Sequence, residues 1–202
     1  MELQDHILNT ITTIGSEIIR KPYRTDIFDP LVLLKLWAYF RNEESLCKNL
    51  QIDSNKGIYM CGPVGCGKTI LFSVCHKIAV PNKKFISKHA LDFTSEFKEI
   101  GESITTLYSN KHFKQNNSPK TLYIEDLGKE NKIFNTIDVV EQILLKRYVY
   151  FNNCGMLTHV CSNLYPEDIL KRYSEAIYSR FAHSMNIIEF KPNSKDLRFK
   201  NY

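Results

Sequence analysis

The sequence predicts an α/β fold built on a parallel β-sheet. Short apolar segments typical of buried strands alternate with helical segments from residue 56 onward. Parallel strands need helical crossovers, and helices on both faces of the sheet leave such strands apolar throughout. The first strand runs into a glycine-rich turn, and two later strands end in polar side chains. We therefore expect a three-layer core in which helices cover both faces of a parallel sheet.

The composition indicates a globular chain with one main domain. The 202 residues are 43% hydrophobic, and 27 basic against 22 acidic residues give a net charge of +5. This charge is compatible with a polyanionic partner but does not identify one. Six cysteines form no Cys-x-x-Cys pair and have no histidine at zinc-finger spacing, which favours a reducing compartment. Since no signal peptide and no run of about 18 apolar residues is present, we expect a cytoplasmic protein with no membrane partner.

Two helices are expected in an N-terminal segment, residues 1–53, that precedes the sheet. Apolar residues recur at helical spacing over residues 1–20, and Lys21-Pro22 ends this pattern. Asp29 then reads as an N-cap before Pro30, which favours a second helix as far as Phe40.

The second predicted domain, residues 54–202, contains the alternating elements. Its strands are expected at residues 56–61, 84–87, 121–124, 156–161 and 186–190. Its helices are expected at residues 67–79, 92–100, 137–151, 166–173 and 175–181. No helix or strand is predicted between Ile100 and Thr121, where the chain becomes strongly polar.

The turn after the first strand reads GPVGCGKT and matches the phosphate-binding pattern G-x-x-x-x-G-K-S/T. Its glycines let the backbone curl so that N–H groups point at phosphate oxygens, and the following helix N-terminus adds partial positive charge. Lys68 is expected to contact the β- and γ-phosphates, and the Thr69 hydroxyl to bind Mg²⁺. A chance glycine-rich turn is the alternative. The nucleoside triphosphate would be held by Gly62, Pro63, Val64, Gly65, Cys66, Gly67, Lys68, Thr69 and Ile70.

Two later strands bring polar side chains to the edge of the sheet at which open α/β folds bind ligands. Glu125 and Asp126 end the strand that begins at Thr121. One acid, Glu125, can hold Mg²⁺, and the next, Asp126, can polarise an attacking water. Asn163 ends the following strand, where its amide can hold that water against the γ-phosphate. The alternatives are an acidic turn and an asparagine that serves only a turn.

Arg180 lies on a short predicted helix after the strand that ends in Asn163. A cation at this place suits an arginine finger, which stabilises the charge of a transferring phosphoryl group in the site of a neighbouring subunit. An exposed surface arginine is the alternative. Its place after the other three motifs favours the finger.

The stretches GPVGCGKT, LYIEDLGKE, THVCSNL and EAIYSRF, in this order, resemble those of the AAA+ ATPases of the DnaC/IstB group. These are bacterial replicative-helicase loaders and ATPase helpers of transposases, and the resemblance covers residues 55–200. It implies Walker A at residues 62–69, Walker B at Glu125 and Asp126, sensor 1 at Asn163 and the arginine finger at Arg180. The family usually has Asp first in Walker B, whereas Glu125 is one methylene longer. Residues 194–198, which read SKDLR, resemble the short arginine-containing end of the group, where Arg198 would have a sensor-2-like role, and no sizeable lid is expected after it.

The resemblance also implies partners: ATP with Mg²⁺, a replicative helicase or a transposase, and further copies of the chain in a homo-oligomer. Members of the group contact single-stranded DNA near the polar segment before the Walker B strand. Rings for base stacking and cations for phosphates would come from Tyr108, Lys111, Phe113, Lys114 and Lys120. An ordinary polar loop is the alternative. Two other functions stay open: a small-molecule kinase, although no arginine-rich lid is evident, and an ATP-binding scaffold with little turnover.

Overall fold

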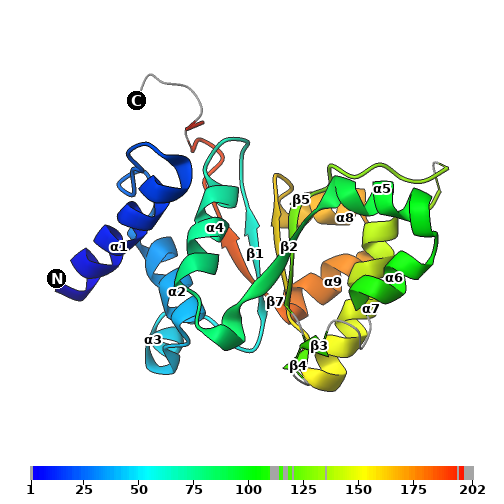
Figure 1. The fold of residues 1–202 in the computed structure, drawn as a ribbon, viewed down its shortest axis with the longest axis horizontal. Helices are drawn as coiled ribbons and strands as arrows, with labels where there is room; N and C mark the ends of the chain where they lie inside the picture. The colour runs from blue at the N-terminus through cyan, green and yellow to red at the C-terminus, as the bar shows by residue number, and fades with distance from the viewer. Residues whose placement is uncertain are drawn as a thin grey trace. The chain divides into compact units, whose positions relative to one another are not determined.

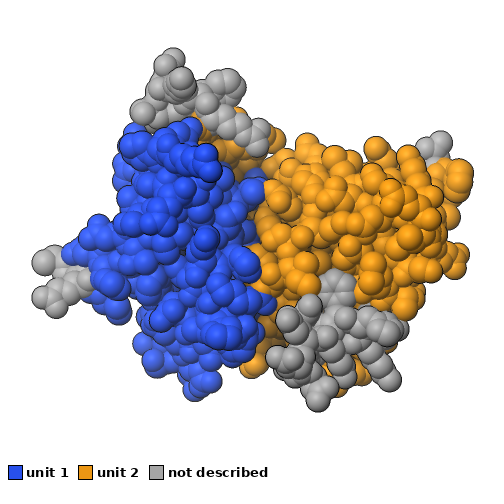
Figure 2. Space-filling model, in the orientation of Figure 1, with its two compact units in different colours: residues 1–54, 67–84, 199–202 blue, residues 55–66, 85–198 orange. Residues whose placement is uncertain are grey.

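The computed structural model describes residues 2–109, 114–115, 118–119, 121–134, 136–194 and 196–197. The chain divides into two compact units, which Figure 2 shows in different colours. Unit 1 comprises Met1–Ser54, Gly67–Lys84 and Phe199–Tyr202, and unit 2 comprises Asn55–Cys66 and Phe85–Arg198. The domain boundary near residue 53 stays a prediction. Within the described ranges, no helix is both long enough and apolar enough to span a membrane.

Unit 1 is helical (Figure 1). Its elements are α1 (Glu2–Ile19), α2 (Pro30–Arg41), α3 (Glu44–Asn49), α4 (Lys68–Ile78) and the 3-10 turn η1 (Pro81–Lys83). Helices α1 and α2 both pack against α4. The Asp29 carboxylate caps α2 as predicted, because it accepts a hydrogen bond of 2.9 Å from the Leu31 N–H. The two helices predicted for this segment are therefore present.

Unit 2 contains a parallel sheet whose five strands lie in the order β2-β5-β6-β1-β7. They are β1 (Gly57–Cys61), β2 (Phe85–His89), β5 (Thr121–Leu127), β6 (Thr158–Ser162) and β7 (Met185–Glu189). Every pairing in this sheet is parallel, which confirms the predicted fold class. A separate antiparallel pair joins β3 (Lys114–Gln115) and β4 (Ser118–Pro119). Because β6 lies between β1 and β5, the turn after β1 and the acids of β5 flank the end of β6.

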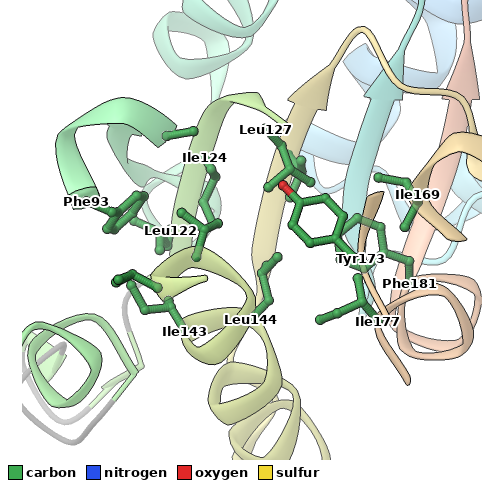
Figure 3. Close-up of a cluster of buried hydrophobic side chains, with 14 of the residues drawn as sticks. Phe93, Leu122, Ile124, Leu127, Ile143, Leu144, Ile169, Tyr173, Ile177 and Phe181 are labelled. Atoms are coloured by element: carbon green, nitrogen blue, oxygen red, sulfur yellow. The ribbon is translucent and has the colours of Figure 1, made fainter. Parts of the chain in front are cut away.

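The helices of unit 2 share one buried cluster with the sheet (Figure 3). They are α5 (Ala90–Ile100), α6 (Ser103–Ser109), α7 (Val139–Cys154), α8 (Pro166–Arg172) and α9 (Glu175–Ser184). Alternate strand residues, such as Leu122 and Ile124 of β5, point to the same face of a sheet. There they meet Phe93 of α5, Ile143 of α7 and Phe181 of α9 in the cluster. This face of the sheet is therefore covered by helices whose apolar sides form the core of unit 2.

Helix α6 corrects the sequence prediction, which placed no helix between Ile100 and Thr121. Ile104 of α6 is fully buried. Tyr108 packs edge-on against Phe93, with ring centroids 4.9 Å apart, and its hydroxyl donates a 2.8 Å hydrogen bond to Glu96. The sequence alone did not predict this short helix, because its stability comes from tertiary packing.

Arg147 of α7 is a buried cation that holds α6 in place. Its guanidinium donates hydrogen bonds of 2.7 Å to the Tyr108 carbonyl, the Leu157 carbonyl and the Thr158 hydroxyl. Burial lowers the pKa of Arg147 to about 9, so the side chain is still charged at neutral pH. One side chain thus joins the end of α6 to the start of β6.

Replacing this cation should destabilise unit 2. Arg147→Met keeps much of the apolar stem but removes a donor from the buried Thr158 hydroxyl and from the part-buried carbonyls of Tyr108 and Leu157, although the Leu157 carbonyl keeps its bond from the Leu122 N–H. We therefore expect a loss of about 2 kcal/mol in the free energy of unfolding. Urea denaturation followed by circular dichroism measures this loss. Lys171→Met, at a mostly exposed cation on α8, is the matched control and should unfold as the unmodified protein does. Equal stability of the Arg147→Met and Lys171→Met proteins would contradict this role.

Candidate nucleotide-binding site

The first part of the phosphate loop, residues 62–66, belongs to unit 2 and depends on two glycines. Gly65 has a φ of 78°, in the region that side chains rarely adopt. A Cβ on Gly62 would lie 2.5 Å from the Cβ of Phe190, so residue 62 has no room for a side chain. The Gly62 N–H donates a 3.3 Å hydrogen bond to the Ser162 carbonyl. Glycine is therefore required by the turn itself, at residue 65 for its positive φ and at residue 62 for its close approach to Phe190.

The second part of the loop belongs to unit 1, and the peptide bond between Cys66 and Gly67 continues the chain into it. Gly67 has a φ of 96° and is the N-cap of α4, whose first turn contains Lys68, Thr69 and Ile70. The Gly67 carbonyl accepts the first helical hydrogen bond, 2.9 Å from the Leu71 nitrogen. The first N–H groups of a helix lack partners within the helix and attract anions. The local backbone on both sides of the boundary thus has the form that a phosphate loop requires.

Glu125 and Asp126 lie in β5 at a break in its pairing with β6. Ile124 pairs with Val160 and Leu127 with Ser162, so two residues of β5 are accommodated opposite one residue of β6. Asp126 has a φ of 54°, which is uncommon for a residue with a side chain. Such bulges re-aim side chains and are frequent beside active sites. Both carboxylates are partly exposed at this edge.

His89, which the sequence did not single out, lies beside the two acids. It ends β2 and pairs with Glu125 in the sheet. Its Nε2 is 3.5 Å from the Asp126 carboxylate, and its Nδ1 accepts a 3.2 Å hydrogen bond from the Leu91 N–H. Because Nδ1 is an acceptor, a neutral His89 carries its proton on Nε2, which faces Asp126. His89 therefore lies beside one of the predicted catalytic groups, with Nε2 3.5 Å from its carboxylate.

Asn163 follows directly after β6, between the end of β5 and the phosphate loop. The buried Ser162 before it donates a 2.5 Å hydrogen bond from its hydroxyl to the Leu127 carbonyl. The same hydroxyl accepts a 3.0 Å bond from the Leu164 N–H. Unit 2 thus brings the loop start, the two acids and Asn163 to the carboxyl ends of adjacent parallel strands, where such sheets bind ligands.

Arg180 does not join these residues within the chain. It lies on α9, with its guanidinium carbon 5.1 Å from the centre of the Tyr148 ring on α7. It lines a shallow cavity, open to solvent, together with Met156, Thr158 and Met185. Thr158 and Met185 are the first residues of β6 and β7, so this cavity lies toward the amino ends of the strands. The acids and Asn163 lie at the opposite ends.

Comparison with solved structures identifies the fold. A DnaC helicase loader superposes with a TM-score of 0.56 at 19% identity, covering 79% of this chain and 88% of the other. A proposed primosome component from Streptococcus pyogenes serotype M3 gives 0.55 at 15% identity, covering 85% and 87%. DnaI gives 0.50 at 21% identity, covering 67% and 73%. The chain therefore shares the α/β fold of these three proteins. No protein-family model and no curated protein sequence matches it.

The residues predicted to contact DNA are only partly described. Tyr108 is engaged in α6 by Phe93 and Glu96, so its ring already has neighbours on the protein. Lys111, Phe113 and Lys120 lie outside the described residues, as does the side chain of Lys114. Arg198 also lies outside them, and its resemblance to a sensor 2 stays a prediction.

A second group that sequence reasoning missed is the Glu130 cluster, which consists of Glu130, Asp138, Arg172 and Tyr173. The buried Glu130 carboxylate accepts hydrogen bonds from the Gly128 N–H (2.8 Å), from Arg172 (3.1 Å) and from the Tyr173 hydroxyl. Arg172 also pairs with Asp138, the N-cap of α7, at 2.8 Å. Burial raises the pKa of Glu130. The loop after the acids is thus tied to the start of α7 and to the end of α8.

Removing this carboxylate should loosen the loop that follows the acids. Glu130→Ala leaves the Gly128 N–H and the Tyr173 hydroxyl without this acceptor and removes one of the two carboxylates that bond Arg172, so we expect a loss of about 3 kcal/mol in unfolding free energy. A double-mutant cycle with Arg172→Ala, measured by urea denaturation, should give a coupling of about 1–3 kcal/mol. Asp26→Ala, in a fully exposed ion pair, is the control and should change little. Strict additivity of Glu130→Ala and Arg172→Ala would contradict the pairing.

Proposed function

We propose that this chain is an ATP-binding and ATP-hydrolysing AAA+ protein that assembles on DNA and loads or remodels a replicative helicase. The observations that carry the proposal are the phosphate-loop motif, with left-handed glycines at residues 65 and 67, and, within unit 2, adjacent strand ends that bear Glu125, Asp126 and Asn163. The shared fold with a DnaC helicase loader and a primosome component supports a replication role. The net charge of +5 is compatible with single-stranded DNA as a partner.

The residues of the site suit Mg²⁺ bound with ATP. Mg²⁺ is a hard cation that takes oxygen ligands and usually one or two protein groups together with phosphates and water. The Thr69 hydroxyl and the Glu125 carboxylate are donors of this kind. Bound there, the ion would neutralise charge on the β- and γ-phosphates. Lys68 and the loop N–H groups would bind the same phosphates from the protein side.

Hydrolysis would use the acid that lies beside His89. The Asp126 carboxylate would polarise the attacking water, and the Nε2–H of His89 would hold that carboxylate in one direction. The Asn163 amide, at the end of the neighbouring strand, would keep the water in line with the terminal phosphate. General-base assistance of this kind contributes typically about 10²–10⁴ in rate.

Arg180 would complete the site of a second copy of the chain. Within its own chain it lies toward the amino ends of the strands, away from the acids, so a contribution in trans needs no rearrangement of α9. A homo-oligomer in which each copy contributes Arg180 to the site of its neighbour is therefore consistent with the position of Arg180 and with that of the acids. The cation would offset charge as the terminal phosphate bond breaks.

Nucleotide binding tests the central claim directly. Lys68→Ala removes the cation from the phosphate loop, and we expect the dissociation constant for Mg-ATP to rise at least about 100-fold, since charged hydrogen bonds to phosphate are lost. Equilibrium titration with a fluorescent ATP analogue measures it. Lys77→Ala, at an exposed lysine of the same helix, is the matched control and should bind as the unmodified protein does. Unchanged affinity of the Lys68→Ala protein, or phosphate delivered to an acceptor molecule instead of water, would contradict the proposal.

The shared site is tested by mixing two inactive proteins. Arg180→Ala should bind ATP normally but hydrolyse it about 10³–10⁵ times more slowly, which is the usual contribution of an arginine finger. Asp126→Asn should also bind ATP without turnover, because an amide cannot act as the base. An equimolar mixture should recover part of the activity, since one interface then combines intact acids with an intact Arg180.

The readout is phosphate release with single-stranded DNA present, and Lys171→Ala serves as a surface-cation control. Light scattering should establish that the two proteins assemble together. Co-assembly without recovery of activity would exclude the shared site, and full activity of Arg180→Ala alone would remove Arg180 from the mechanism.

A further inference from the structure

The chain after β7 returns to the phosphate loop within unit 2. The Phe190 N–H donates a 2.8 Å hydrogen bond to the Cys61 carbonyl, directly before the loop. The Phe190 carbonyl accepts a 2.8 Å bond from the Tyr165 hydroxyl, which fixes this point to the segment before α8. Farther along, the Leu197 N–H donates a 3.0 Å bond to the Gly65 carbonyl. The segment 190–197 is thus bonded near both ends to the loop or its strand.

Asp196 brings a carboxylate against the loop itself. A Cβ built on Gly65 would lie 1.9 Å from Oδ1 and 2.1 Å from Cγ of Asp196. The carboxylate therefore fills the space that a side chain at residue 65 would take. Gly65 is thus required twice, by its positive φ and by this close approach. The sequence pattern predicted no role for Asp196.

An acidic group is unexpected beside a loop built to bind phosphate. Backbone N–H groups of such a loop attract anions in general, and a carboxylate is an anion that the chain itself supplies. A triphosphate bound to the same loop carries several negative charges. Two like charges a few ångströms apart repel each other strongly where water is partly excluded. Binding of a nucleotide to the loop therefore has an electrostatic cost as long as the Asp196 carboxylate stays beside Gly65.

We propose that Asp196 is an affinity-determining residue of the nucleotide site, whose carboxylate competes with the phosphates of the nucleotide for the loop. The inference rests on the proposed function, because it needs a nucleotide at Gly62–Thr69. Binding then requires the segment 190–197 to yield at Asp196 or to bear the repulsion. The loop consequently favours nucleotide whose charge is reduced by Mg²⁺ over nucleotide without it.

The test is the Asp196→Asn protein, since asparagine keeps the size of the side chain and one acceptor oxygen but removes the charge. Titration with the fluorescent ATP analogue at low salt should show binding about tenfold tighter than in the unmodified protein. The gain should be larger without Mg²⁺ than with it, and it should shrink at high salt, where charges are screened. Asp92→Asn, an exposed aspartate on α5, makes the same charge change away from the loop and should have no effect.

Each result separates the inference from the proposed function. If the unmodified protein binds ATP and Asp196→Asn binds no tighter, the inference is wrong and the nucleotide site stands. Weaker binding of Asp196→Asn only in the presence of Mg²⁺ also overturns the inference, because the carboxylate would then support the metal. If neither protein binds nucleotide at any concentration, the proposed site is wrong and the inference falls with it. Tighter binding that is independent of Mg²⁺ and salt would show loosened packing and would likewise overturn it.

Discussion

The candidate site of unit 2 depends on the hydrogen bonds of one residue, Ser162. Its carbonyl accepts from the Gly62 N–H, and its hydroxyl bonds both the Leu127 carbonyl and the Leu164 N–H. Ser162 is fully buried at the end of the strand that lies between β1 and β5. Neighbouring strands of a sheet lie about 4.8 Å apart. Three hydrogen bonds thus fix the start of the loop at Gly62, the end of β5 and the segment that contains Asn163 at the carboxyl edge of the sheet.

Arg147 and Glu130 are two of the buried charged side chains that the structure describes in unit 2, and they are stabilised in different ways. Arg147 has neutral partners, two carbonyls and a hydroxyl, and burial lowers its pKa to about 9. Glu130 instead faces the guanidinium of Arg172 and the Tyr173 hydroxyl. A buried charge without such partners would cost several kcal/mol. Arg147 organises α6, whereas Glu130 organises the loop after the acids, so each charge holds a segment that has little apolar surface of its own.

Much of the fold could be predicted from the sequence, because its main signals are local. Apolar runs marked the five strands, and the glycine spacing marked the phosphate loop before any strand order was known. Helix α6 was missed because Ile104 and Tyr108 are stabilised by α5 and α7, which lie elsewhere in the sequence. The prediction of Tyr108 as a free stacking ring depended on that missing helix.

The candidate site was predictable to a similar extent and for the same reason. Glu125, Asp126 and Asn163 could be placed because each ends an apolar run. His89 could not, because its role follows from β2 lying next to β5, and strand order is not written in a local pattern. Glu130 resembles any surface acid in the sequence, and only the partners Arg172 and Tyr173, more than forty residues later, show that it is buried. Asp196 was hidden in the same way, because its neighbour Gly65 is far away in the chain.

The Glu130 cluster finally connects the two ends of unit 2 that the proposed mechanism uses. Arg172 bonds both Glu130, in the loop after the acids, and Asp138, at the start of α7. Arg172 is the last residue of α8, and only Tyr173 and Ser174 separate it from α9. Helices α7 and α9 run from this point toward the cavity that Tyr148 and Arg180 line. Both helices are packed into one core (Figure 3). The position of Arg180 relative to the acids of its own chain is therefore set by packed helices and not by a loop. Unit 2 can therefore present the acids at one end and the Arg180 cation at the other. Each copy in an assembly would then offer both halves of a site in a constant geometry.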